Sequence, residues 1–232
     1  MLIGSGLLAT AFAATFSHRE DVCVYAAGVS NSSCLDRSEF EREKARLHEA
    51  LKNWDADRLF VYFGTCSVAD PDAKHTPYVQ HKLAMERLVS AHPNHLVVRL
   101  PQVAGRTPNP HTLLNFLHAR ISRSEAFQLW MLARRNIIDV DDVVALSSQL
   151  VESNGSHNVV INVANTTNYS MLEIVQAMER SVGKSAIYQS LERGSGYEID
   201  TSTILPILQS AGVAFGPGYL QRVADTYYGK AY

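Results

Sequence analysis

The stretch Leu2-Ile3-Gly4-Ser5-Gly6-Leu7-Leu8-Ala9 decides the fold that we predict for this chain. Two apolar residues suit a short buried strand, and the alanine- and leucine-rich residues 7–14 favour a helix. Between them lies a G-x-G-x-x-A pattern, whose glycines permit a tight turn and let the backbone approach a phosphate closely. Because a helix N-terminus attracts negative charge, the pattern is typical of a pyrophosphate-binding turn. A simple tight turn is the alternative explanation.

Segments with strand and helix character alternate after this turn. Continuous apolar runs predict buried strands at residues 22–26, 58–63, 96–98 and 159–163. Charged or amphipathic segments predict helices at residues 39–51, 77–90 and 141–151. We therefore expect an α/β fold with a Rossmann-type, mostly parallel sheet and right-handed crossovers.

The rest of the chain does not alternate in this way, and we expect it to form a smaller lobe. Residues 105–135 contain one predicted helix and little other regular structure, and the tail from Ser170 is predicted to be helical with short glycine breaks. The expected organisation is a dinucleotide-binding core at residues 1–104, a substrate-lobe insertion at 105–135, a return to the core at 136–168, and a substrate lobe with C-terminal helices at 169–232.

The composition argues against several other classes of protein. With 46% hydrophobic and 19% charged residues, the chain of 232 residues resembles an ordinary globular protein. A net charge of −2 and the lack of a basic stripe predict that it does not bind nucleic acid. No apolar run reaches the roughly 18 residues that span a bilayer, and residues 1–16 lack the positive charge that begins a signal peptide, so we expect no membrane association. The three cysteines fit neither a disulfide framework nor a metal site, which predicts reduced thiols, no metal and a cytoplasmic protein.

Tyr78 and Lys82 are the first candidates for catalysis, because residues four apart share one face of a helix. A nearby cation lowers the pKa of a phenol from about 10 and suits it to proton transfer. The alternative is an exposed surface pair. Thr65 and Ser67 follow a predicted strand, at the end where ligands gather, and either hydroxyl could bind a substrate oxygen. The alternative for these two is a turn whose hydroxyls cap the backbone.

The order of these motifs resembles the extended branch of the short-chain dehydrogenase/reductase superfamily, which comprises nucleotide-sugar epimerases, dehydratases and reductases. The resemblance rests on the glycine turn, the Y-x-x-x-K pair and the stretches at residues 25–28 (YAAG), 63–68 (FGTCSV), 99–105 (RLPQVAG), 135–143 (RNIIDVDDV), 162–164 (NVA) and 169–174 (YSMLEI).

The resemblance implies a bound NAD or NADP and a nucleotide-sugar substrate. The implied cofactor-binding residues are Gly4, Ser5, Gly6, Leu7, Leu8, Ala26, Ala27, Gly28 and Lys82. Thr65, Tyr78 and Lys82 would form the catalytic set, with Tyr78 as acid and base. The implied substrate contacts are Ser67, Asn115 and Arg135, with Arg135 on the diphosphate. A homodimer through the helices at residues 39–51 and 77–90 is also implied.

Two departures from the family pattern affect the prediction. The family's second and third strands are missing from the sequence, and residues 25–28 offer no carboxylate at the place, about 20 residues after the glycines, where one usually holds the adenosine ribose. This leaves NAD and NADP both open. Cys66-Ser67 stands where the family's 4,6-dehydratases have Asp-Glu, which disfavours dehydration.

We therefore predict an NAD(P)-dependent epimerase or keto-reductase of a nucleotide-linked sugar, working in polysaccharide or related sugar synthesis. The shortened cofactor half keeps a second class open, a non-catalytic nucleotide-sugar-binding or scaffold protein derived from the same family. A reductase of some carbonyl other than a sugar is the third possibility.

Overall fold

A five-stranded parallel sheet forms the central layer of the computed structural model, which describes residues 1–153 and 157–229. The strands follow the order β1-β2-β3-β4-β8 and comprise Leu2–Ile3, Val22–Tyr25, Leu59–Thr65, His95–Leu100 and Val159–Asn162. All four neighbouring pairs are parallel. The predicted α/β fold with a Rossmann-type parallel sheet is therefore confirmed.

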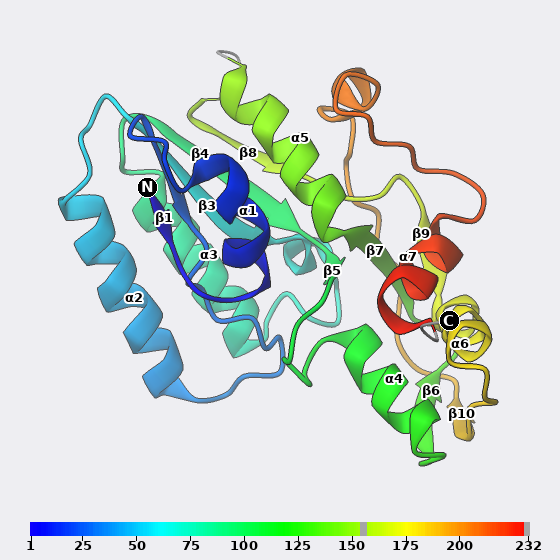
Figure 1. Cartoon of the computed structure of the whole chain (residues 1–232). Helices are drawn as coiled ribbons and strands as arrows, with labels where there is room; N and C mark the ends of the chain where they lie inside the picture. The colour runs from blue at the N-terminus through cyan, green and yellow to red at the C-terminus, as the bar shows by residue number, and fades with distance from the viewer. Residues whose placement is uncertain (154–156, 230–232) are drawn as a thin grey trace.

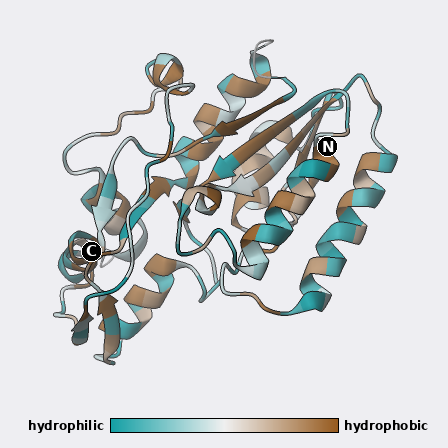
Figure 2. Cartoon of the chain, turned by 180° about the vertical axis from the view of Figure 1, so that it is seen from behind, coloured by the Kyte–Doolittle hydropathy of each residue, from teal (hydrophilic) through white to brown (hydrophobic). Residues whose placement is uncertain are grey.

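Helices cover both faces of this sheet (Figure 1). One face carries α1 (Leu7–Phe16) and α5 (Val140–Glu152), and the other carries α2 (Arg37–Lys52) and α3 (Pro77–Val89). In Figure 2 the strands of the sheet are mainly brown, while the helices beside them carry both colours, as expected of a buried sheet between amphipathic helices.

Neighbouring residues of one strand serve the two faces in turn. On β3, Val61 and Phe63 pack in the core beneath α1 and α5, whereas Phe60 and Tyr62 pack against α2 and α3. Because side chains alternate along a strand, a run of apolar residues is what a strand buried on both faces requires.

The strand β1 lies at the edge of the sheet. The chain passes from α1 directly into β2, which pairs with β1 through Leu2↔Val24 and Ile3↔Tyr25. Among the described residues, no strand pairs with the other edge of β1. The sheet thus lacks the two strands whose absence the sequence predicted.

A second group of elements packs around its own apolar core (Figure 1). It contains three helices, which are α4 (Leu113–Ser122), α6 (Met171–Val182) and α7 (Tyr219–Tyr228). Its strands are β5 (Gln102–Ala104), β6 (Phe127–Trp130), β7 (Arg134–Asp139), β9 (Asn168–Ser170) and β10 (Tyr188–Leu191). The helix α6 begins with a capping box between Ser170 and Glu173 and ends at Gly183, whose φ of 73° suits glycine.

Two local predictions were wrong. Residues 105–135 contain the strand β6 besides the predicted helix, and β6 pairs with β10 in parallel, from Phe127↔Tyr188 to Trp130↔Leu191. The tail from Ser170 is not helical throughout, because it supplies β10 and then a long irregular segment before a short 3-10 helix, η3 (Leu205–Ile207). Both strands have four residues, so the partner strand, and not a local periodicity, defines them.

Candidate active site

A cavity of about 480 Å³ crosses the carboxyl ends of β1 to β4. Its walls come from the β1–α1 turn, the residues after β2, the end of β3 and the first turns of α3. Eleven of the predicted site residues line it: Ser5, Gly6, Leu7, Leu8, Ala26, Ala27, Gly28, Thr65, Ser67, Tyr78 and Lys82. Since ligands bind at the carboxyl ends of strands in open α/β sheets, this cavity is the candidate active site.

The glycine turn is built for close contact with the strand end beside it. Gly4 has a φ of +139°, and a Cβ at this position would lie 2.4 Å from the carbonyl oxygen of Ala26. Gly6 is the N-cap of α1, and among the described residues no side chain caps this helix and no other atom lies within 4 Å of the place of a Gly6 Cβ. The N-terminus of α1 is therefore open to a phosphate group, which fits the predicted pyrophosphate-binding turn.

Tyr78 and Lys82 reach the cavity from the first turns of α3. Pro77 occupies the first helical position, and the Thr76 hydroxyl accepts a hydrogen bond from the Val79 amide, so the start of this helix is fixed. The side chains of Tyr78 and Lys82 are buried, with 8% and 3% exposure. The alternative of an exposed surface pair is therefore excluded.

Lys82 has a buried partner that the sequence did not reveal, the carboxylate of Glu43 on α2. The Lys82 Nζ lies 3.2 Å from Glu43 Oε1, and the Tyr62 hydroxyl donates to the same oxygen at 2.8 Å. The amide of Val29 donates to Glu43 Oε2 at 2.6 Å, and His81 Nε2 lies 3.0 Å from that oxygen. Glu43 is 2% exposed, so this carboxylate belongs to the interior of the site.

The structure corrects the predicted direction of the Tyr78 pKa. Burial, together with the nearby charge of Glu43, raises the pKa of Tyr78 to about 12, although the Thr65 side chain acts in the opposite sense. Burial also lowers the pKa of Lys82, which the Glu43 charge opposes. The lowered phenol pKa was predicted from a close Lys82, but the Lys82 ammonium binds Glu43 and lies over the ring of Tyr62, 4.6 Å from its centre.

Thr65 ends β3 and begins the short 3-10 helix η1 (Cys66–Ala69). Its hydroxyl accepts a hydrogen bond from the Ser67 amide at 3.1 Å, and both side chains line the cavity. Thr65 therefore both caps the backbone and faces the cavity, so the two explanations given for its hydroxyl do not exclude each other. Cys66 is 1% exposed, and burial raises the pKa of its thiol to about 12, so it offers no thiolate near neutral pH.

Asn115 and Arg135, the two predicted substrate contacts of the smaller lobe, are not among the residues that line the cavity. The Asn115 amide donates to the carbonyl oxygens of Thr107 and Asn109, which lie in a loop that does line it. Arg135 donates to the carbonyl oxygen of Arg134 at 2.8 Å, and 4.0 Å separates its guanidinium from Asp70. Asn115 therefore shapes a cavity wall, and Arg135 lies outside the set of residues that line the cavity with Tyr78.

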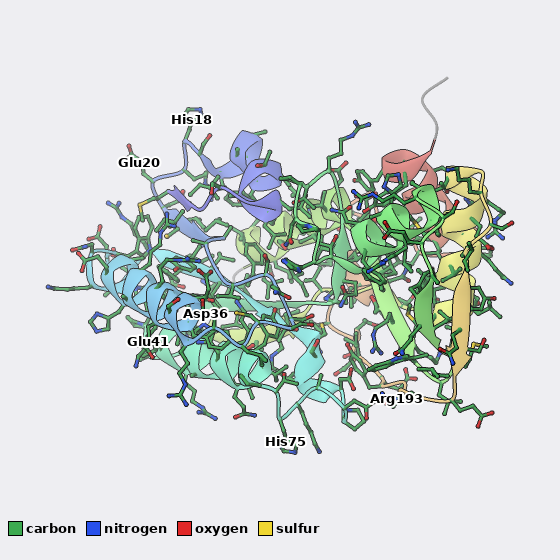
Figure 3. All side chains as sticks on the ribbon, turned by 90° about the horizontal axis from the view of Figure 1, so that it is seen from below. His18, Glu20, Asp36, Glu41, His75 and Arg193 are labelled. Carbon is green, nitrogen blue, oxygen red and sulfur yellow. The ribbon has the colours of Figure 1, made fainter. Side chains whose placement is uncertain are left out.

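Histidines and other polar groups add little further chemistry. His75 is exposed and projects from the surface (Figure 3), whereas His111 lines the cavity. In the part of the chain that the structure describes, no cluster of three or more metal-ligating side chains occurs. No described helix is both long and apolar enough to cross a membrane.

The family comparison agrees with this geometry. Residues 42–164, a little over half of the chain, match the model of the NAD dependent epimerase/dehydratase family. The matched segment includes Glu43, Thr65, Tyr78 and Lys82, whereas the glycine turn precedes it. No curated protein is similar enough in sequence to match the chain.

Solved structures with the same fold include three proteins in complex with a dinucleotide. The UDP-glucuronic acid 4-epimerase from Bacillus cereus, in complex with UDP-glucuronic acid and NAD, is 22% identical, with 90% of this chain and 74% of that chain covered and a TM-score of 0.71. The UDP-glucose 4-epimerase of Thermus thermophilus, in complex with NAD, is 15% identical, with 94% and 80% covered and a TM-score of 0.69. RMD from Pseudomonas aeruginosa, complexed with NADPH, is 16% identical, with 88% and 79% covered and a TM-score of 0.68.

Proposed function

Because the chain belongs to the NAD dependent epimerase/dehydratase family, we propose that it is an NAD(P)-dependent enzyme that epimerises or reduces a nucleotide-linked sugar. One observation carries the proposal. The buried pair Tyr78 and Lys82 faces the same cavity as Thr65 and the open N-terminus of α1. A binding protein without catalysis has no need to keep a phenol, an ammonium and a hydroxyl together in a buried cavity.

The residues of the chain divide the work between binding and proton transfer. The turn ending at Gly6 binds the pyrophosphate through the N-terminus of α1, and Lys82 binds the ribose beside the reacting ring. When bound, the nicotinamide supplies or accepts a hydride. The Tyr78 hydroxyl gives a proton to, or takes one from, the oxygen on the substrate carbon that gains or loses this hydride. The Thr65 hydroxyl donates a hydrogen bond to that oxygen.

The charge state of Tyr78 favours the reductive direction. Since burial raises the pKa of Tyr78 to about 12, the phenol is protonated at neutral pH and ready to donate to a carbonyl oxygen. Elimination of water would need a carboxylic acid beside Thr65, but the next two residues are Cys66 and Ser67. We therefore place the reduction of a keto-sugar, or the epimerisation of a sugar at a hydroxyl-bearing carbon, ahead of dehydration.

Turnover tests this proposal most simply. The wild-type protein and Tyr78→Phe are incubated with nucleotide-linked 4-keto-sugars and NADH or NADPH, and with nucleotide-linked sugars and NAD⁺ or NADP⁺, while dinucleotide absorbance and product epimers are followed. Loss of the transferable proton should lower turnover about 10²- to 10⁴-fold and leave cofactor binding intact. A protein that binds the dinucleotide and turns over none of the sugars would contradict the proposal. Turnover of simple ketones alone would point to a carbonyl reductase of another kind.

Three further statements stay predictions from the sequence. They are a homodimer through α2 and α3, a cytoplasmic location, and a direct contact of Arg135 with the substrate diphosphate. The last requires a movement of the Arg135 side chain away from Asp70 and toward the cavity.

A further inference from the structure

One wall of the active-site cavity is a loop of the smaller lobe, which we call the wall loop (residues 107–111). It leads into α4, and its residues Thr107, Asn109 and His111 line the cavity together with Gly6 and Leu7 at the start of α1. The same five residues also line a neighbouring cavity of about 400 Å³. Because it borders two cavities, the wall loop depends on hydrogen bonds more than on packing for its position.

Asn115 on α4 binds the wall loop with both N–H groups of its side chain. Its Nδ2 donates to the carbonyl oxygen of Thr107 at 2.9 Å and to that of Asn109 at 2.7 Å. Inside the loop, the Asn109 amide donates to the Thr107 hydroxyl, and the His111 amide donates to the side-chain oxygen of Asn109. Asn109 Nδ2 also donates to the Ser30 hydroxyl at 3.1 Å, across to the loop after β2. Asn115 therefore fixes a turn that reaches from α4 to the core.

The Asn115 side chain is itself held by Tyr228 on α7, which lies 113 residues further along the chain. The Tyr228 hydroxyl donates to Asn115 Oδ1 at 2.7 Å. Burial raises the pKa of Tyr228 to about 12, so this hydroxyl keeps its proton near neutral pH. If the amide turned over, its oxygen would face the two carbonyl oxygens of the wall loop, which offer it no donor. Tyr228 thus completes the hydrogen bonding of Asn115 in the orientation that binds the loop.

We propose that Tyr228 is a positioning residue of the active site, which acts through Asn115 on the wall loop and so sets the shape of the wall that the substrate meets. The inference rests on the proposed function and goes beyond it by giving α7 a part in substrate binding. Neither Tyr228 nor Asn115 lines the cavity, so their effect on the substrate is indirect. The preceding residue offers a contrast, because the Tyr227 hydroxyl donates to Asp139 Oδ1, at the start of α5 and not at the wall loop.

Hydrogen exchange of the full chain, followed by mass spectrometry on peptides that cover the wall loop, tests the inference without turnover. Tyr228→Phe removes the hydroxyl and keeps the ring beside His118, and the loss of one hydrogen bond should speed exchange in the loop about 2- to 10-fold. Tyr227→Phe is the matched control, because it removes a hydroxyl from the same helix and should leave exchange in the loop unchanged. In the Asn115→Ala background, Tyr228→Phe should have no further effect on the loop, since its partner is gone.

Steady-state kinetics with a nucleotide-linked sugar that the wild type converts give the functional readout. Tyr228→Phe should raise the KM for the sugar about 3- to 10-fold and change kcat by less than about twofold, because the wall loop binds substrate while Tyr78 and Lys82 stay in place. Tyr227→Phe should change neither constant. A purely structural role of Tyr228 would lower the melting temperature, as Tyr227→Phe also does, and would leave KM unchanged.

Each outcome decides the inference. Exchange or KM at the wild-type value in Tyr228→Phe, an equal effect of Tyr227→Phe, or an effect of Tyr228→Phe that persists in the Asn115→Ala background would overturn it. Faster exchange and a raised KM in Tyr228→Phe alone, both absent when Asn115 is already alanine, support it. If the wild type converts no nucleotide-linked sugar, the proposed function fails, while the exchange rates still decide whether Tyr228 holds the wall loop.

Discussion

Replacing Glu43 by glutamine tests whether the buried carboxylate organises the active site. The substitution keeps the shape of the side chain and removes its charge, so Lys82 loses its counter-ion while remaining 3% exposed. The new amide also turns its NH₂ group either toward the Val29 amide or toward the Tyr62 hydroxyl, both of which donate hydrogen bonds to Glu43. We therefore expect a large loss of stability.

The magnitude follows from the burial of both charges. Removing one partner of a buried ion pair costs about 3–5 kcal/mol, because it leaves the other charge uncompensated. For a chain of this size, about 1 kcal/mol shifts the melting temperature by 2–4 °C, so Glu43→Gln should melt roughly 6–20 °C below wild type. Lys82→Met should cost a similar amount, since it leaves the Glu43 carboxylate buried beside Tyr62 and Val29.

A double-mutant cycle measures the coupling energy between Glu43 and Lys82 directly. Thermal and urea unfolding are recorded for wild type, Glu43→Gln, Lys82→Met and the double variant Glu43→Gln/Lys82→Met. The double variant removes both charges, and we expect it to be more stable than the sum of the single effects predicts by about 1–3 kcal/mol. A cost below about 1 kcal/mol for Glu43→Gln, or strict additivity of the two substitutions, would refute the view that this pair is one buried unit.

Three further predictions concern the turn, the pH dependence and the cavity wall. Gly4→Ala places a Cβ 2.4 Å from the Ala26 carbonyl oxygen and forces a left-handed backbone on alanine, so melting temperature and dinucleotide affinity should both fall, as thermal unfolding and titration would show. The folded-state pKa of Glu43 is about 2, against an ordinary 4.5, because the charge of Lys82 and several hydrogen bonds outweigh its burial. Its contribution to stability is complete above about pH 4.5 and is lost as the pH falls toward 2, so wild type should lose stability in this range and Glu43→Gln should lose less. Asn115→Ala frees the loop at residues 107–109 and should raise the KM for substrate more than it lowers kcat, which steady-state kinetics would reveal.

Much of the fold followed from local patterns in the sequence. The strands β2 and β3 are continuous apolar runs because both faces of each are covered, and α3 begins at Pro77, where the predicted helix at residues 77–90 begins. The β1–α1 turn was recognised because only glycine tolerates the conformation and close packing at Gly4. Each of these signals lies within a few neighbouring residues.

The features of the site that the sequence analysis did not predict depend on contacts between residues far apart in the sequence. Glu43 lies on the apolar face of its helix, between Phe40 and Leu47. A carboxylate on an apolar helix face was the signal in the sequence that could have revealed a buried ionic site. Its partner Lys82 lies 39 residues away, so spacing on one helix could not predict the pair. The direction of the Tyr78 pKa depends on burial, which the sequence does not encode locally.

The site's central claim is that Lys82 and the glycine turn hold a dinucleotide for hydride chemistry beside Tyr78. Calorimetric titration with NADH and NADPH of wild type and of the double variant Glu43→Gln/Lys82→Met tests it most directly, because this variant removes the ammonium without leaving a buried unpaired charge. The account predicts micromolar binding by wild type and binding at least about tenfold weaker by the folded double variant. No binding by wild type, or the same affinity in both proteins, would contradict it.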